Sequence, residues 1–177
     1  NLIAECIDVW LLVQKKWMYL EGIFIGNEDI RQQLKDESKK FDKNNQAFKK
    51  IMETTYKTPN VYACCVLYEN RLTELKTLSD ELDKRQKSLS DYLDRKRNIF
   101  PRFYFLSDED LLSILGSSDP SAVQPHMLKL FDNCKELLMS RSKQVVGMES
   151  DEGEKFDLRE AIKPEGPVEV WMTNVDN

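Results

Sequence analysis

Residues 70–98 form a stretch of 29 residues that contains neither glycine nor proline. Apolar side chains recur through it at three- and four-residue steps, a spacing typical of one face of an α-helix. They are Leu72, Leu75, Leu78, Leu82, Leu89, Tyr92 and Leu93. On the other faces acidic residues precede basic ones by four positions, an order that stabilises a helix by a few tenths of a kcal/mol per pair. These pairs are Asp80–Lys84, Glu81–Arg85, Asp83–Lys87 and Asp91–Arg95. The stretch therefore predicts one helix about 43 Å long.

The rest of the chain also favours helix. The sequence has only 6 glycines and 6 prolines in 177 residues, against roughly 12% in an average protein. We expect helices over residues 1–20, from the glycines at 22 and 26 to Lys57, over Val61–Tyr68, from Ser107 to Gly116 and over Pro120–Met139, with a buried extended segment at Arg102–Leu106. The predicted fold class is mainly α: an elongated helical bundle or arch with one long helix and a small β-hairpin near the C-terminus.

The hairpin is predicted from residues 144–159, where two short β-like runs flank Ser150-Asp151-Glu152-Gly153. Glycine at the last of these positions supplies the positive φ that such a turn requires. We expect a single fragment that is helical over 1–140, a hairpin and loop over 141–166, and the start of a further helix over 167–177. Because the chain begins with Asn1 and already reads as helix there, we interpret it as part of a longer polypeptide without a signal peptide.

Composition argues against nucleic acid and membrane as partners. The net charge is −5; residues 101–177 carry the excess, with 15 acidic and 8 basic residues, and this disfavours nucleic acid. No run of about 18 apolar residues exists, so we expect no membrane span. The four cysteines, Cys6, Cys64, Cys65 and Cys134, show no C-x-x-C spacing, and reduced thiols are the favoured interpretation.

Residues suited to catalysis or metal binding are few. No phosphate loop of the G-x-x-x-x-G-K-[ST] type and no G-x-G-x-x-G motif occurs. The one histidine, His126, is a weaker candidate for a general base than for a packed or exposed helix residue, and Ser117-Ser118 has no histidine close enough in sequence to activate a nucleophile. A zinc site could form only if folding brought His126 and the cysteines together. The acidic run Asp108-Glu109-Asp110 could bind a cation, but it suits a helix N-terminus better. We expect no catalytic, cofactor or metal site.

Residues 17–24 match the pattern W-x-Y-L-E-x-I-F, and residues 100–112 match F-P-R-F-x-F-x-x-x-x-x-L-L. Residues 166–172 match G-x-V-E-x-W-L, with Met172 in place of leucine. These three motifs, in this order, resemble the linker region of dynein heavy chains. The residues that carry the resemblance are Trp17, Tyr19, Leu20, Glu21, Phe24, Phe100, Pro101, Arg102, Phe103, Phe105, Leu111, Leu112 and Trp171. Residues 115–127 look more like axonemal than cytoplasmic heavy chains.

The resemblance implies a mechanical element without catalysis. In this family the linker is a helical arch across a ring of ATPase modules, and it moves with the nucleotide cycle. The implied partners are the ring of the parent motor, microtubules and other dynein chains, with a cytoplasmic, cytoskeletal and ciliary axonemal location. The fragment itself should be monomeric and bind no nucleic acid or membrane. The alternative is a helical-bundle or coiled-coil adaptor, which would explain residues 72–93 but not the F-P-R-F-Y-F segment.

Overall fold

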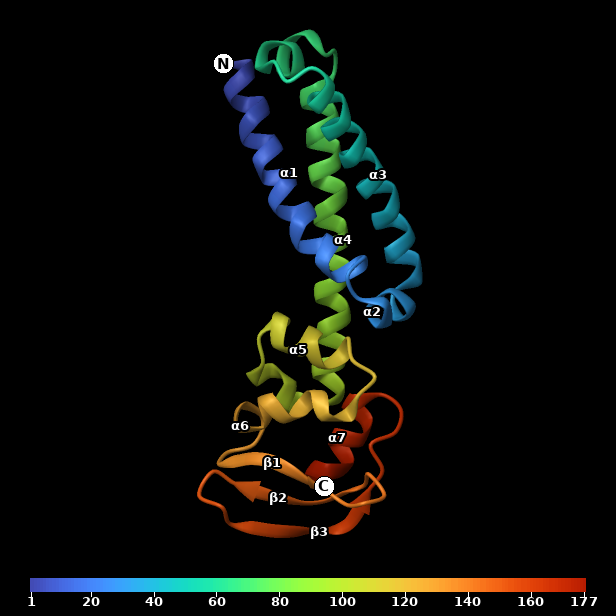
Figure 1. Ribbon diagram of the computed structural model, residues 1–177, viewed down its shortest axis with the longest axis vertical. Coiled ribbons are helices and arrows are strands. Elements are labelled where there is room, and N and C mark those ends of the chain that lie inside the picture. The colour runs from blue at the N-terminus through green and yellow to red at the C-terminus, as the bar shows by residue number, and fades with distance from the viewer. The chain divides into compact units, whose positions relative to one another are not determined.

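The computed structural model describes all 177 residues, and Figure 1 shows their helices and strands. The α-helices are α1 (Leu2–Phe24), α2 (Glu28–Gln33), α3 (Lys35–Lys57), α4 (Arg71–Ile99), α5 (Asp108–Leu115), α6 (Met127–Leu130) and α7 (Val168–Asp176). Shorter helical turns are η1 (Ala63–Leu67), η2 (Pro101–Phe105) and η3 (Pro120–His126), and the strands are β1 (Cys134–Met139), β2 (Val145–Ser150) and β3 (Lys155–Ile162). The chain divides into two compact units, Asn1–Leu89 and Ser90–Asn177. The fold is mainly helical with a small sheet near the C-terminus, as predicted.

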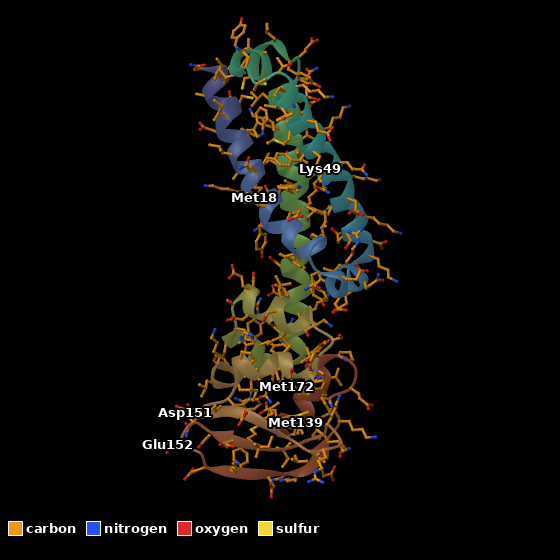
Figure 2. All side chains as sticks on the ribbon, in the orientation of Figure 1. Met18, Lys49, Met139, Asp151, Glu152 and Met172 are labelled. Carbon is orange, nitrogen blue, oxygen red and sulfur yellow. The ribbon has the colours of Figure 1, made fainter.

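The first unit packs α1 and α3 against α4 (Figure 1). Its core is a continuous set of fully or almost fully buried apolar side chains: Cys6, Val13, Leu20, Phe24, Ile30, Phe41, Phe48, Leu75, Leu78 and Leu82. Asn27 caps α2 with a side-chain hydrogen bond to the Ile30 amide. The outer face of α1 remains exposed, and Figure 2 shows Met18 projecting away from the bundle.

The long helix α4 confirms the prediction from its apolar stripe, since Leu75, Leu82, Leu89 and Leu93 are at most 1% exposed. The predicted i,i+4 ion pairs are wrong. Asp83 instead accepts an ion pair from Lys16 of α1, and the others do not come within ion-pair distance. A salt bridge to a neighbouring helix fixes two elements together, whereas a pair along one helix supports only that helix.

The second unit has an antiparallel sheet in the order β1-β2-β3, with α6 packed near β1 and α7 near β3 (Figure 1). The hairpin of β2 and β3 is confirmed, with Gly153 at φ 86° in its turn; Asp151 and Glu152 lie at its tip (Figure 2). The ladder shifts register between Val145 and Gly147, and Gly147 opposes Asp157. A Cβ at Gly147 would lie 2.6 Å from the Phe156 carbonyl oxygen, so the two backbones approach too closely for any other residue.

The predicted helix over Pro120–Met139 is wrong. The segment forms η3, one turn of α6 and then β1, so the sheet has a third strand. Asn133 reverses the chain direction with φ 53°, in the left-handed region that asparagine tolerates. The Gln124 side chain then bonds both the amide and the carbonyl of Leu137, at 2.8 and 2.9 Å, and holds β1 in place.

The predicted extended segment over Arg102–Leu106 is also wrong, because Pro101–Phe105 is a 3₁₀ helix. Proline at its first position has a suitable φ and needs no acceptor for an N–H group. The predicted N-cap of α5 is confirmed, since Ser107 accepts the Asp110 amide at 3.1 Å, and Gly116 is its C-cap. None of the helices has both the length and the apolar character that a membrane crossing requires.

Candidate functional site

The first motif lies on α1 and connects α1 to α3. Trp17 is half-buried: its indole Nε1 donates to Asn45 Oδ1 at 2.9 Å, and its ring lies 5.0 Å from the Phe48 ring. Phe24 is fully buried, and its ring stacks on Phe41 at 5.4 Å. The remaining motif side chains are Leu20, which is buried, and Tyr19 and Glu21, which are half-buried. Trp17 and Phe24 of this segment therefore join α1 to α3.

Ion pairs attach α1 and α3 to α4. Lys16 of α1 lies 2.7 Å from Asp83 Oδ1 and also donates to Ser79 Oγ at 2.8 Å. On α3, Glu37 Oε2 lies 3.1 Å from Arg85 Nε, and both side chains are mostly buried, at 19% and 8% exposure. These pairs occupy positions on α4 between its leucines, so both the polar and the apolar residues of the helix contact its neighbours.

The second motif folds into η2 and the residues around it. Phe100 and Phe103 are at most 1% exposed, and their rings meet edge to face at 4.9 Å. Phe105, which the sequence places in a buried segment, is 68% exposed. The difference follows from the 3₁₀ turn, because residues two positions apart point in different directions there.

Among the residues of the second motif, Arg102 makes the most polar contacts. Its Nε donates to Asp176 Oδ2 and its Nη2 pairs with Asp176 Oδ1, both at 2.9 Å, while Nη1 donates to the Leu130 carbonyl at 3.2 Å. The guanidinium also lies 4.4 Å from the centre of the Phe131 ring. The Asp176 carboxylate raises the pKa of Arg102 through this hydrogen bond. One side chain thus joins η2 to both α6 and α7.

The last part of the second motif is the core of α5, where Leu111 and Leu112 are 0% and 8% exposed. Arg97 fixes the start of this helix: its Nη2 donates to Asp108 Oδ1 at 2.7 Å and to the Leu106 carbonyl at 3.2 Å. A carboxylate in the first turn also interacts favourably with the helix dipole. The acidic run therefore has a structural role at the N-terminus of α5.

The third motif places a carboxylate inside the second unit. Trp171 is 3% exposed, and Glu169 in the first turn of α7 is also 3% exposed. Glu169 Oε1 forms an ion pair with Lys96 Nζ of α4, while Glu169 Oε2 is buried without a hydrogen-bond partner. Burial, with a contribution from the Glu169 charge, raises the pKa of the neighbouring Tyr92 to about 12. The motif glutamate thus joins α7 to α4.

Folding brings a histidine to a serine and an aspartate, which the sequence does not reveal. His126 Nε2 lies 3.1 Å from Ser113 Oγ, and His126 Nδ1 lies 3.5 Å from Asp110 Oδ1. The order of atoms is that of a nucleophile, a base and an orienting carboxylate. However, the Ser113 hydroxyl donates its hydrogen to the Asp110 carbonyl at 2.7 Å, so Nε2 must be the donor to Oγ. A general base has to accept that proton instead.

Asp110 is also engaged elsewhere, since Lys129 Nζ donates to its Oδ2 at 2.7 Å. This hydrogen bond is the main cause that lowers the pKa of the Asp110 carboxyl. The cluster therefore fastens α5 to η3 and α6. No group of three or more His, Cys, Asp or Glu side chains is placed to hold a metal ion, and all four cysteines are free and buried.

These features define a structural module in which the motif residues join neighbouring helices. The chain belongs to the dynein heavy chain family: the family model described as "Dynein heavy chain, N-terminal region 2" matches residues 1–177.

The similar curated proteins are also dynein heavy chains. It is 55% identical to the "Dynein-1-alpha heavy chain, flagellar inner arm I1 complex" of Chlamydomonas reinhardtii, over 99% of this chain and 4% of that protein. It is 54% identical to human "Dynein axonemal heavy chain 10", over 100% of this chain and 4% of that protein. Mouse "Dynein axonemal heavy chain 2" is 48% identical over 99% of this chain. The chain spans about 4% of the length of these relatives.

Proposed function

We propose that this module is a mechanical linker, or lever, of an axonemal dynein heavy chain. In this proposal it transmits ATP-driven changes of the motor ring into force on microtubules, and it works in the cytoskeleton of a cilium or flagellum. The ring of the same polypeptide, microtubules and other dynein chains are its proposed partners. The module itself has no catalytic role, and ATP hydrolysis belongs to other parts of the heavy chain.

The observation that carries this proposal is that the uninterrupted helix α4 contributes buried side chains to both compact units. Its 29 residues run without interruption, and its buried leucines contribute to both units, with Leu82 in the first and Leu93 in the second. A single helix that belongs to two cores is suited to carry load, because bending it requires the packing around it to change. The axonemal relatives support the proposed location.

The alternative of a coiled-coil adaptor requires a free heptad seam on α4. The side chains that would form this seam are already buried within the chain, including Leu75 and Leu78 of the first unit. Light scattering distinguishes the two: the lever module is monomeric, whereas an adaptor with a free seam forms a dimer.

Interrupting α4 in the parent motor tests the lever. Leu82 is fully buried, and Leu82→Pro removes a helical hydrogen bond and clashes with the preceding turn, at a cost of about 3 kcal/mol or more. We expect the variant to retain basal ATPase activity and lose most of its microtubule gliding speed. Leu82→Ala keeps the helix and only creates a cavity, so its gliding speed should lie between.

An exposed position on the same helix provides the control. Gln86→Ala should leave both ATPase activity and gliding unchanged, since residue 86 is exposed. Normal gliding by a folded Leu82→Pro motor would refute the lever. An equal loss of ATPase and gliding would show that the module also gates the ring.

A further inference from the structure

The first unit buries an arginine that lacks hydrogen-bond acceptors. The Arg71 side chain at the start of α4 is 1% exposed. Its guanidinium carbon lies 3.9 Å from the centre of the Tyr68 ring and 5.5 Å from that of Trp10. Two aromatic rings favour the cation, but they accept none of its N–H groups in the plane of the guanidinium.

Two of the three guanidinium nitrogens have no partner. Arg71 Nε and Nη1 are buried without a hydrogen bond, and the nearest carboxylate oxygen, Glu74 Oε2, is 3.7 Å from Nη1. That separation exceeds a hydrogen bond. A buried charged donor left unpaired is destabilising, so the site lacks an acceptor.

A groove next to Arg71 provides room for one. It lies between α3 and α4, has a volume of about 430 Å³, and is lined by Asn44, Ile51, Tyr68, Arg71, Thr77 and Leu78 among others. This volume is in the range of binding sites for small ligands. Asn44 Oδ1, on the α3 wall, is buried and unpaired as well. Asn44 on α3 and Arg71 on α4, each with an unpaired polar atom, therefore both line the same groove.

The charges around the groove favour an anionic group. Lys50 on the rim takes part in no salt bridge, whereas the rim carboxylate Glu81 is already paired with Lys84 at 2.6 Å. Glu74 is 45% exposed and makes only the long contact with Arg71. The apolar walls at Ile51 and Leu78 favour a ligand in which the anionic group is flanked by apolar groups.

We propose that this groove binds a peptide segment through an aspartate or glutamate carboxylate, which accepts hydrogen bonds from Arg71 while adjacent apolar side chains pack between α3 and α4. Glutamine at the same peptide position keeps the shape and loses the charge. Glu74 acts as a competitor, because its carboxylate is the only one within 4 Å of the guanidinium nitrogens.

The binding of two matched peptides to the 177-residue protein tests this site. The probes are acetyl-Leu-Glu-Leu-amide and acetyl-Leu-Gln-Leu-amide, with affinity from calorimetry and location from amide chemical shifts of α3 and α4. We expect the glutamate peptide to bind at least about tenfold more tightly than the glutamine peptide, as a charge-assisted hydrogen bond implies. Equal affinity, or no binding by either peptide, overturns the proposal.

Three variants assign the effect to Arg71. Arg71→Met preserves length and removes an unpaired buried charge, so the protein should fold and lose the preference for glutamate. Glu74→Gln removes the competitor and should strengthen glutamate binding, whereas Lys50→Met on the rim should weaken it by no more than about threefold. Unchanged affinity in Arg71→Met overturns the proposal, as does an equally large loss in Lys50→Met.

A final comparison separates a peptide from a free carboxylate. Sodium acetate supplies the anionic group without the apolar neighbours. If acetate shifts the same amides at the same concentration as the glutamate peptide, the peptide assignment is wrong. Shifts that require the peptide support it. None of these measurements depends on motor activity, so they are independent of the lever.

Discussion

Removing one partner of the ion pair between Lys96 and Glu169 should destabilise the second unit strongly, whereas removing both partners should not. The two side chains are 19% and 4% exposed, so neither can recover its hydration when the other is lost. Lys96→Met leaves a buried, uncompensated carboxylate, and we expect a loss of about 3–5 kcal/mol in the free energy of unfolding.

Removing both charges should cost much less. In Lys96→Met combined with Glu169→Leu, apolar groups of similar size replace the pair, and the free energy of unfolding should stay within about 1 kcal/mol of the original. The double-mutant cycle, measured by urea unfolding with far-UV circular dichroism at pH 7, should therefore give strong coupling.

An exposed pair at similar distance is the matched control. Lys84 and Glu81 lie 2.6 Å apart, with 63% and 36% of their side chains exposed. The same cycle on this pair should give at most about 0.5 kcal/mol, and less in 1 M salt. If the Lys96 and Glu169 substitutions were additive, or as sensitive to salt as the control pair, the conclusion that they form a desolvated contact would be wrong.

Three further perturbations test the second unit. Because the pKa of Tyr92 is raised to about 12, the folded state holds its proton more tightly than the unfolded chain; the free energy of unfolding should fall by about 2 kcal/mol as the pH rises from 10 to 12, and Tyr92→Phe should remove that fall. Gly147→Ala should cost about 1–3 kcal/mol in thermal unfolding, because its Cβ would meet the Phe156 carbonyl at 2.6 Å; an unchanged melting temperature would contradict the close approach. Phe103→Ala should cost about 3–5 kcal/mol, whereas the exposed Phe105→Ala should stay within about 0.5 kcal/mol; equal losses in urea unfolding would refute the 3₁₀ geometry of this segment.

Local signals were sufficient for several elements. The leucine spacing of α4, the Ser107 cap of α5 and the glycine of the hairpin turn each depend on residues close in sequence, and the structure confirms all three. Such features follow from backbone geometry and from one apolar face, both of which a single segment encodes.

The errors arose where a distant residue decides the outcome. The leucines of Cys134–Met139 suit a helix as well as a strand, and the strand forms because Asn133 turns the chain and Gln124 binds the backbone of Leu137. Asparagine in the left-handed region is far less predictable than glycine. The α4 salt bridges failed for the same reason, since Lys16 reaches Asp83 from 67 positions away.

The candidate site was predictable only in part. Sequence resemblance identified motif residues, but not what each one contacts. The partners of Arg102 are Asp176 and Leu130, and those of His126 are Ser113 and Asp110; each set depends on how several elements pack. No local signal could have shown that Arg71 would be buried without an acceptor.

The polar residues of the motifs bear on the proposed lever. A buried pair such as Lys96 and Glu169 adds little net stability compared with apolar residues of the same size. What it adds is geometric restriction, because the charges are compensated only when α4 and α7 lie in one register. The two-point contact of Arg102 with Asp176 restricts η2 and α7 in the same way. A module that only needed to be stable could use leucine at these positions, whereas a module that transmits displacement must also resist slipping between its helices. The placement of charge inside the joints is therefore what the lever proposal requires.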